Sequence, residues 1–374
     1  MRAYGRGRER RIAPPSAARR DKRHCESSSS RSARLATPFW QSSMDAVVPR
    51  LEGVNGGLWR AVTRGRLVAL GAAAALAVCV PAAFAAARGG ALGGAAPTQP
   101  DLAAMALSTT DLPRGAVVKS QGYEGGNAFP LFYSREFASG ASIGSSRVLG
   151  LLSTVGLAND YGQATLVVAG FAAELKTKQG RMNLVRRVLP DLQKYPRSAI
   201  GITYGGSRSF GVGDDSLEAE LTVTLHRVRV PLSLAVVRVD RVVSALEIAG
   251  SPNKSVARRD VANLSGKVAV HIKTGLLPVN YAPPTISGTA QLGQTLTAAT
   301  GSWTNWTSAQ TVYVIQWQRC DTLGAGCTAI PGATAATYAV TTADVGRTLR
   351  VSIAASNPTG TSQAAVSAQT AVIS

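Results

Sequence analysis

The sequence predicts two folded parts of different class: an α+β domain, in which an antiparallel sheet is covered by helices, and then an all-β sandwich. Residues 217–225 alternate apolar and polar side chains, which indicates a strand with one buried face. Residues 164–175 carry apolar side chains at helical spacing. After residue 283, short Thr-rich and Ala-rich stretches separated by Gly, Pro and Asn turns are typical of a sandwich.

Positive charge is concentrated at the front of the chain. The net charge is +19 over 374 residues, and residues 1–66 alone hold 15 Lys and Arg against 5 Asp and Glu. The apolar content of 45% is ample for packed cores. Because more than half of the excess charge precedes the folded parts, the total charge does not argue for a nucleic-acid partner.

Residues 1–43 mix Arg, Pro and Ser with almost no apolar periodicity, so we expect them to be disordered. A segment with the proportions of an ordinary signal peptide begins at Met44. This indicates that Met44 is the true start and that residues 1–43 reflect a mis-annotated start. Cys25, which lies in this stretch, is given no role.

Residues 44–87 are expected to direct export. Three arginines precede the apolar run LVALGAAAALAVCV, a proline and the small-residue run AAFAAA, which is the order of a secretory signal peptide. We expect cleavage before Ala86. A retained membrane anchor at residues 67–87 and a lipidated Cys79 are the alternatives, although the branched residue before Cys79 favours its interpretation as an apolar filler.

Two breaks in composition divide the remainder. Residues 88–100 form a Gly-, Ala- and Pro-rich linker, and residues 277–282 form a Pro-containing hinge. Residues 101–276 carry 21 Lys and Arg and 14 Asp and Glu, whereas residues 277–374 carry 3 and 2. The change in charge predicts an α+β domain at residues 101–276 and a separate sandwich at residues 283–374.

The first half of the α+β domain is predicted to form strands followed by helices. Strands are expected at residues 116–123, 131–137 and 147–158. A helix then begins at an N-cap formed by Asn159 or Asp160, and a short second helix runs from near Met182 to Leu189 and stops at Pro190. The buried face of the first helix is predicted to be Ala164, Val168, Phe171 and Leu175.

The second half contains the alternating strand, whose polar side we expect to be solvated, and a hairpin that turns at Asp240 and Arg241. Asp260 is predicted to cap a last helix that ends at Gly275. The buried face of this helix is predicted to be Val261, Leu264, Val268 and Ile272.

The run GVGDDS (Gly211–Ser216), followed by VVRVDRVVSALEIAG and a terminal helix, resembles small exported actinobacterial lipoprotein and sensor domains with a Mog1/PsbP-like sandwich. The resemblance covers roughly residues 105–276. Those relatives usually have Gly at the hairpin turn, where this chain has Asp240. The resemblance implies an extracytoplasmic binding or sensing scaffold, and it assigns no ligand residues.

The segments PPTISGTAQLGQTLTAATGSW, YVIQWQRCDTLGAGCTAIPGATAATYAV, TTADVGRTLRVSIAASNPTG and AVSAQTAVIS resemble, in that order, the bacterial Ig-like modules of exported actinobacterial proteins. The resemblance covers residues 283–374. Trp317 stands in the strand where such folds bury an aromatic side chain, and Asp344 to Gly346 match the turn before a late strand. Thr348 occupies the position of the corner tyrosine of many Ig domains. Such modules typically space, adhere or bind sugars.

Cys320 and Cys327 remain as an even pair once the expected leader is removed. Thiols of exported proteins oxidise, a zinc site needs two further ligands, and the C-x6-C spacing lacks the C-x-x-C redox pattern. We therefore predict a disulfide that clips a loop, and we expect no metal and no cofactor.

No sequence motif for a phosphate loop, a zinc protease or a nucleophile elbow is present. The best enzymatic candidates are Asp214 and Asp215 with His226 or His271. Acids in a GVGDDS run are more typical of a turn, His226 falls on the polar side of its strand, and His271 adjoins an apolar stripe. We assign no catalytic residue. A secreted hydrolase with its active site in residues 101–276 is the alternative.

A set of arginines offers candidate contacts with an anionic partner. Arg227 and Arg229 are expected to alternate on one strand face, and Arg238 and Arg241 to flank the hairpin. Such a partner would be an envelope polymer such as teichoic acid, or phospholipid headgroups. The alternative is a solvated face that protects a sheet edge. Without stacking aromatics between the arginines, nucleic acid is not expected.

Together these features predict a non-enzymatic exported protein that is secreted or associated with the cell envelope. Its α+β domain would bind an envelope polymer, a glycan or a protein, and its Ig-like module would add reach or adhesion. Contact with a membrane is expected only through the N-terminal segment, if it stays uncleaved. The oligomeric state and the identity of the ligand are left open.

Overall fold

The computed structural model describes residues 97–125, 129–138 and 142–374. The expected disordered start, the signal or anchor segment and most of the linker lie outside these residues. Among the helices of the described residues, none combines the length and the apolar character needed to cross a membrane.

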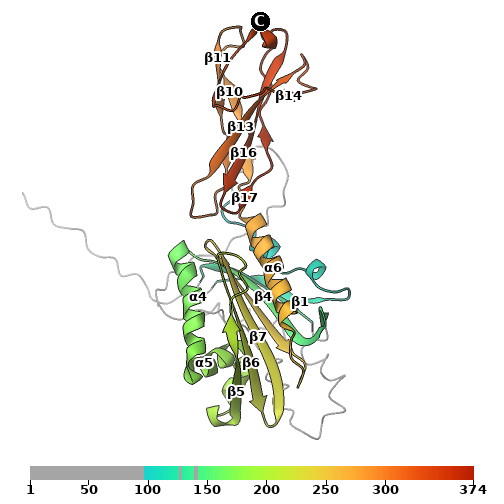
Figure 1. The fold of residues 1–374 in the computed structure, drawn as a ribbon, viewed down its shortest axis with the longest axis vertical. Helices are drawn as coiled ribbons and strands as arrows, with labels where there is room; N and C mark the ends of the chain where they lie inside the picture. Colours follow the sequence, from blue (N-terminus) through green and yellow to red (C-terminus); the bar gives the residue numbers. More distant parts are fainter. Residues whose placement is uncertain (1–96, 126–128, 139–141) are drawn as a thin grey trace, which may run out of the picture. The chain divides into compact units, whose positions relative to one another are not determined.

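One antiparallel sheet organises the first part of the described chain (Figure 1). Most strands that follow each other in the sequence pair as antiparallel neighbours. By contrast, the pairing of β4 with β8 joins the two halves of the sheet through strands distant in sequence. The strands predicted from residues 116–123, 131–137 and 147–158 are all present. The order across the sheet is β1 (Val118–Glu124), β2 (Leu131–Phe137), β4 (Ser146–Leu157), β8 (Val242–Gly250), β7 (Val228–Val239), β6 (Asp215–Leu225) and β5 (Ile200–Arg208), and β3 (Ser142–Ile143) pairs with β4.

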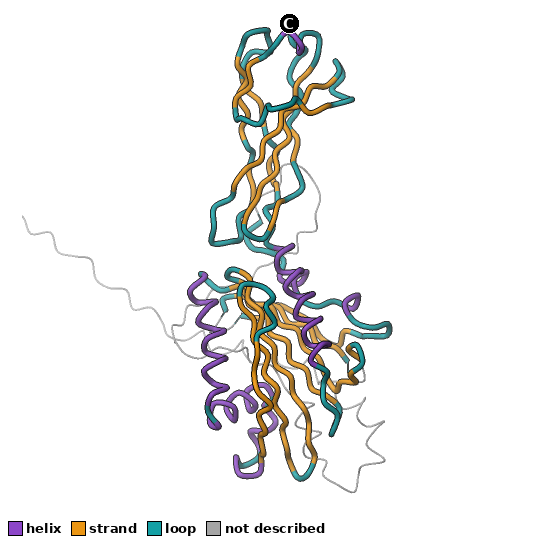
Figure 2. The backbone as a smooth tube through the Cα atoms, in the orientation of Figure 1, coloured by secondary structure: helices purple, strands orange, loops and turns teal. Residues whose placement is uncertain are grey.

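Helices cover both faces of this sheet (Figures 1 and 2). The helices α4 (Tyr161–Lys176) and α5 (Lys178–Val188) pack on one face and form the first hydrophobic core with it. On the other face, α3 (Leu102–Met105) and α6 (Arg258–Gly275) form the second core. The prediction of an antiparallel sheet covered by helices is confirmed for this part.

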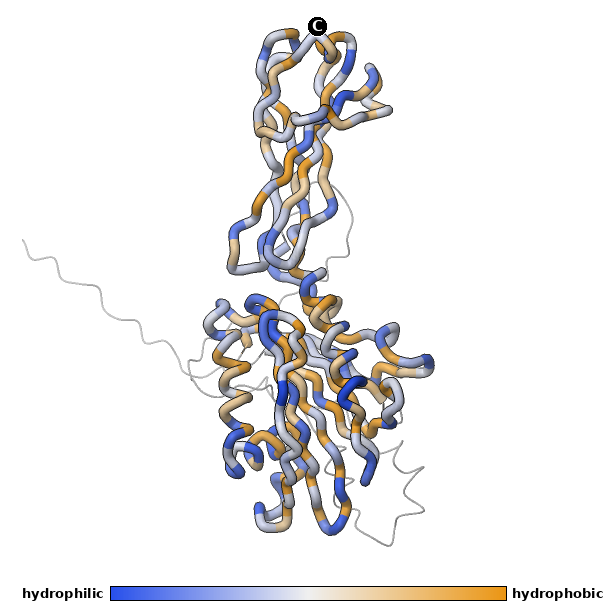
Figure 3. Tube along the Cα trace, viewed as in Figure 1, coloured by the Kyte–Doolittle hydropathy of each residue, from blue (hydrophilic) through white to orange (hydrophobic). Residues whose placement is uncertain are grey.

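The first helix follows its sequence pattern closely. The Asp160 side chain accepts a hydrogen bond from the Gln163 backbone N–H at 2.7 Å, which satisfies one of the free donors of the first turn. The predicted buried face is confirmed, and Figure 3 shows hydrophobic residues recurring along α4 and the central strands. The second helix begins earlier than predicted, at Lys178 with Thr177 as its N-cap, and a 3-10 turn from Pro190 to Lys194 follows it.

Asp260 is not the cap of the last helix, contrary to the prediction. Helix α6 begins at Arg258, three residues earlier than predicted, with Ala257 at the N-cap position, and Asp260 lies in its first turn, 5% exposed. Its carboxylate accepts hydrogen bonds from the Ser145 backbone N–H and the Ser146 hydroxyl. These partners lie more than 100 residues away in sequence, so local pattern could not reveal them. The predicted buried face and the end at Gly275 are confirmed.

The polar side of β6 is not fully solvated, contrary to the prediction. Residues Ala219, Leu221, Val223 and Leu225 face the first core, as expected. On the opposite side, however, Glu218 is only 1% exposed. The guanidinium groups of Arg208 on β5 and Arg258 at the start of α6 both pair with Glu220 on this side of β6. These two segments therefore lie close to the polar side of the strand.

From residue 280 onward the described chain is all-β. Two antiparallel sheets contribute side chains to a third hydrophobic core. One sheet has the order β10 (Thr285–Ser287), β11 (Thr295–Ala299), β15 (Thr337–Ala339). The other has the order β14 (Thr328–Ala329), β13 (Val312–Cys320), β16 (Thr348–Asn357), β17 (Gly360–Thr361), with β18 (Ala365–Val366) beside β16, and β9 (Asn280–Ala282) pairs with β12 (Ser302–Trp303).

Trp317 of β13 is completely buried in this core, as predicted. Its ring stacks on Tyr338, with ring centroids 5.4 Å apart, and its indole N–H donates to the Ala335 carbonyl oxygen at 2.9 Å. A buried tryptophan needs such an acceptor for its single donor. The aromatic pair therefore ties the two sheets together at the centre of the core.

Candidate functional site

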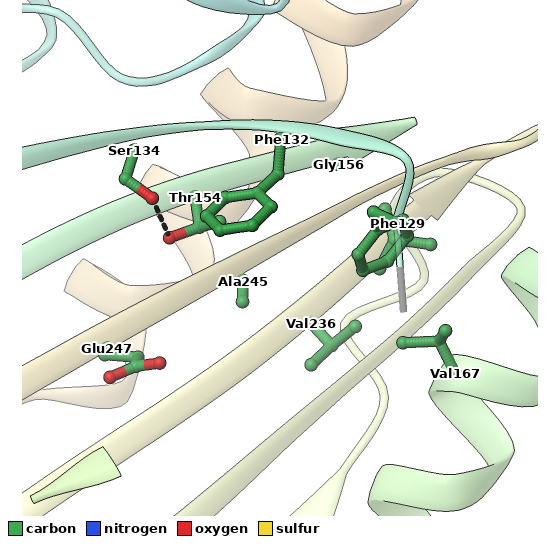
Figure 4. A pocket seen from close by; sticks show the side chains of 10 residues that line it. Phe129, Phe132, Ser134, Thr154, Gly156, Val167, Val236, Ala245 and Glu247 are labelled. Atoms are coloured by element: carbon green, nitrogen blue, oxygen red, sulfur yellow. Dashed lines mark hydrogen bonds between the residues drawn. The ribbon is translucent and has the colours of Figure 1, made fainter. Parts of the chain in front are cut away.

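A cavity lies on the α4-facing side of the sheet, at the joint of β2, β4, β8 and β7 (Figure 4). The strand register places its lining in successive rows. Phe132, Gly156 and Val243 form an apolar row across β2, β4 and β8. The next row along the strands contains two hydroxyl groups, and the third contains the carboxyl group of Glu247. Polarity therefore increases along the cavity in one direction.

The apolar end is closed by the ring of Phe129. A Cβ atom added at Gly156 would lie 2.7 Å from Cγ of Phe129, so the ring rests directly on the glycine. No other residue at this position would allow the ring to lie so close to the sheet. Phe132, Val167 of α4 and Val236 of β7 complete the apolar wall (Figure 4).

The middle of the cavity carries the hydroxyl groups of Ser134 and Thr154, whose oxygen atoms are 3.1 Å apart. Either can donate to the other, so one hydroxyl hydrogen stays available for a further acceptor. The small side chain of Ala245 lies beside them on β8 and leaves the cavity open at this point.

Glu247 forms the polar end. Its side chain is partly buried, and within the described residues its carboxyl group has no hydrogen-bond partner. Burial raises the pKa of Glu247 to about 8, and the Arg187 guanidinium offsets this only in part. Arg187 itself pairs with Glu174. At neutral pH the carboxyl group is therefore mostly protonated, and it can donate a hydrogen bond as well as accept one.

The cavity is narrow in this conformation. Its volume for the centre of a water molecule is about 20 Å³, which corresponds to room for about one water. A ligand group that enters must be of that size unless the Phe129 ring moves aside.

The four arginines predicted to meet an anionic partner do not form one surface. Arg227 lies in the turn between β6 and β7, with a φ of 79°, rather than on a strand face, and Arg229 is exposed nearby on β7. Arg238 is only 4% exposed. The Arg241 side chain donates to the Trp306 carbonyl oxygen at 2.9 Å.

Arg238 has an internal role instead. Its guanidinium lies 4.5 Å from the ring centre of Tyr161 and 3.4 Å from the Asp214 carboxylate. It also donates to the Asp240 carbonyl oxygen at 3.2 Å, inside the hairpin turn predicted at Asp240 and Arg241. A cation with these partners stabilises the turn, and a buried cation cannot contact a large anionic polymer.

Three of the four residues of the hydrolase hypothesis contact partners outside that set, and the fourth, Asp215, is exposed. Asp214 accepts the Asp240 backbone N–H at 2.6 Å, which is a turn contact, and Asp215 is exposed at the start of β6. His271 lies 3.4 Å from the Asp111 carboxylate. His226 is in the turn after β6, not on the strand as predicted, and its ring lies beside that of Tyr195.

The predicted disulfide between Cys320 and Cys327 is present, and their Cα atoms are 4.0 Å apart. It closes the loop between β13 and β14. Among the described residues, no cluster of three or more His, Cys, Asp or Glu side chains is arranged to hold a metal ion.

Sequence reasoning missed Glu247. The signal was available, because Glu247 is the one charged residue within the apolar strand Val242–Gly250. A lone carboxyl group in such a strand either has a buried partner or faces a cavity, and the sequence alone does not separate these cases. Compared with known proteins, the chain matches no protein-family model and no curated protein.

Proposed function

We propose that this chain is an exported, non-enzymatic protein of the cell envelope or the secreted fraction, whose α+β domain binds a small ligand in the cavity that ends at Glu247. The C-terminal Ig-like module would provide reach or adhesion. The observation that carries the binding function is the cavity itself, with an apolar end, a hydroxyl pair and an unpaired carboxyl group. Apolar walls with a few convergent polar groups are typical of small-molecule sites, and because the cavity has room for about one water, a ligand would enter as the Phe129 ring moves aside.

The Cys320–Cys327 disulfide supports the extracytoplasmic address, because structural disulfides persist mainly in oxidising compartments. It agrees with the order of basic, apolar and small residues at 60–87. We expect the mature protein to begin at Ala86 or within a few residues of it. Mass spectrometry of protein from its native cells measures this. Peptides from residues 1–43 in extracytoplasmic material would refute both the signal and the start at Met44.

The chemistry of the cavity indicates a ligand with a short apolar part and a head group that accepts a hydrogen bond. The apolar part would contact Phe132 and Val236, and the head group would meet the Ser134 and Thr154 hydroxyls and protonated Glu247. Because an ionised carboxylate cannot donate, we expect affinity to fall as the pH rises through about 8.

A titration with 1-butanol, followed by the backbone amide signals in NMR spectra, tests this site in the full chain. We expect saturable shifts at Thr154, Gly156 and Ala245. An Ala245→Leu variant fills the cavity and should lose them, whereas Ala173→Leu, the same change at an exposed site of α4, should not. Equal shifts in both variants would remove the cavity from the proposal.

The secreted hydrolase remains the alternative. Asp214 and His271 each have a different partner, which weakens it. A double variant Asp214→Asn and His271→Gln would abolish activity on a hydrolysable substrate if the alternative held.

A further inference from the structure

A second hollow, separate from the Glu247 cavity, lies on the opposite face of the sheet, beside α6. It runs between the loop Gly211–Gly213 and the outer side of α6 from Gly266 to Lys273, and its volume is about 580 Å³. This is the size of an ordinary small-ligand site. The first three residues of the GVGDDS run line it, whereas no residue of this run lines the Glu247 cavity.

The ionisable side chains that line this groove are all basic. Lys267, His271 and Lys273 line it, and the rest of its lining consists of Gly, Ala and Val with no acidic residue. Lys273 is exposed and, within the described residues, has no hydrogen-bond or ion-pair partner. A lysine that is already held by an acid gains little from a ligand, whereas an unpaired one gains a new ion pair.

Two acids adjacent to the groove lining, Asp111 and Asp214, have partners of their own. Asp111 lies 3.4 Å from His271, and its carbonyl oxygen accepts a hydrogen bond from the Lys267 ammonium group. Asp214, the residue after the loop, faces Arg238 and the Asp240 backbone. Lys273 is therefore the lysine of this lining that is left for a ligand.

The loop supplies a backbone donor. Gly211 and Gly213 both have a φ of +69°, which glycine adopts without strain. The Ser216 hydroxyl accepts the N–H groups of Phe210 and Val212 at 3.2 and 3.4 Å and so shapes the loop. Among the described residues the Gly213 N–H has no such acceptor. Glycine N–H groups beside lysines are a common way to hold phosphate oxygens.

On the helix side, Gly266 leaves the groove open. No atom lies within 4 Å of the position that its Cβ would occupy. Val270, which is 60% exposed, provides an apolar contact one turn further along. The groove thus has the Lys273 ammonium group, the Gly213 backbone and the apolar surface of Val270 in its lining.

From these contacts we infer that the groove between Gly211–Gly213 and α6 binds the phosphate group of a small phosphate ester, with Lys273 as the main cationic contact. The ester's carbon skeleton lies against Val270 and Gly266. The same chemistry occurs in free glycerol phosphate and in the headgroup of an anionic phospholipid, and the experiment separates these two sources.

Binding to the full chain is measured by isothermal titration with glycerol 3-phosphate. Binding to membranes is measured by co-sedimentation with phosphatidylcholine vesicles, with and without about 30 mol% of the anionic lipid phosphatidylglycerol. Binding of the soluble ester alone indicates a free ester. Binding of both, and of vesicles only when they contain the anionic lipid, indicates a headgroup. Binding of neither overturns the inference.

Two variants and a control locate the site. Lys273→Ala should weaken binding by roughly tenfold, whereas Lys254→Ala, which removes the same charge from an exposed lysine away from the groove, should change it less than about twofold. Equal effects would mean diffuse attraction to a basic surface and would refute the site.

Gly266→Leu provides a variant that blocks the groove without harming the fold. The side chain would enter open space, and replacement of a mid-helix glycine should leave the unfolding temperature equal or higher. We expect loss of phosphate-ester binding with unchanged binding of 1-butanol in the other cavity. Retained ester binding in Gly266→Leu would contradict the inference.

Discussion

The two parts of this protein bury their acids in opposite ways. In the α+β part, Glu218 is buried and Glu247 is partly buried, and neither carboxyl group has a hydrogen-bond partner among the described residues. In the C-terminal part, Asp344 is fully buried and accepts four hydrogen bonds. The donors are the Thr341 N–H and hydroxyl, the Tyr338 hydroxyl and the Arg319 guanidinium, at 2.7 to 2.9 Å.

The difference shows that burial alone does not decide the state of a carboxyl group. Burial raises the pKa of Glu247 and of Glu218, where the neighbouring Glu220 adds to it and Arg208 offsets it only in part. Burial also acts to raise the pKa of Asp344, but hydrogen bonds from Thr341, Arg319 and Tyr338 outweigh it, and the pKa lies below its ordinary value. A buried carboxylate that accepts several hydrogen bonds stabilises the fold. A buried carboxyl group without such donors is available to bind a ligand.

The largest expected effect is that of Asp344→Ala. The change leaves the Arg319 charge and the Tyr338 hydroxyl without their partner, so we expect a loss of ~3–5 kcal/mol in the free energy of unfolding of the C-terminal part. Urea unfolding followed by tryptophan fluorescence measures it, because Trp303, Trp306 and Trp317 all lie in this part. The exposed control Asp215→Ala should cost less than ~0.5 kcal/mol.

The same variant has a defined pH dependence. Because the folded pKa of Asp344 is depressed, its contribution is present above the ordinary value of 3.8 and is lost as the pH falls through the folded pKa. The stability difference between wild type and Asp344→Ala should therefore shrink below about pH 4. A difference that stays constant down to pH 2 would contradict the role of the ionised carboxylate.

The next effect concerns the disulfide. Replacing Cys320 and Cys327 together with Ser should cost about 2.5 kcal/mol in the C-terminal part, on the chain-entropy model for so short a loop. A chelator should have no effect on the unmutated protein. Thiol labelling of denatured, non-reduced protein provides the check: two reactive thiols from this pair in exported material would contradict the disulfide and weaken the export proposal.

Glu247→Gln should stabilise the α+β part. A folded pKa of about 8 against an ordinary value of 4.5 means that the folded state binds the extra proton between these values, so the native carboxyl loses stability as the pH rises. The full shift corresponds to ~5 kcal/mol at pH 9. Solvent reaches the partly buried side chain and screens part of this cost, so we expect a gain of ~2 kcal/mol for Glu247→Gln at pH 9 and almost none at pH 4.

Hydrogen exchange of β7 and β8, measured at both pH values, gives the local free energy of opening for this change. The control is Glu124→Gln, an exposed glutamate of β1, which should show no such pH dependence. A gain for Glu247→Gln that is equal at pH 4 and pH 9 would mean that the charge of Glu247 is not the cause.

The smallest effect is expected for Glu218→Gln. Arg208 lies 3.5 Å from the Glu218 carboxylate and recovers part of the burial cost, so the gain at pH 7 should be ~1 kcal/mol or less. Hydrogen exchange of β5 and β6 measures it. A larger gain than that of Glu247→Gln would reverse the ranking and show that Arg208 contributes little.

Much of the fold follows from local pattern. The buried face of α4, its cap at Asp160 and the core side of β6 were all predictable, because they depend on spacing within one element. Asp260 was misassigned as a cap for the opposite reason, since its partners Ser145 and Ser146 come from a distant strand. Arg238 was misplaced on the surface because α4 supplies Tyr161 from far along the chain.

Local sequence was enough to predict the periodic elements and the pairing of Cys320 with Cys327, because each depends on residues close together in the chain. Which polar groups are functional candidates depended instead on contacts between distant segments. In the sequence, Glu247 is a single acid within a strand, and the structure places it in a cavity lined by β2, β4 and α4. Lys273 is an ordinary helical lysine in the sequence, and the structure places it in a groove with the Gly211–Gly213 loop. Burial and available partners set the chemistry of both, and these depend on contacts between segments that the linear order keeps apart.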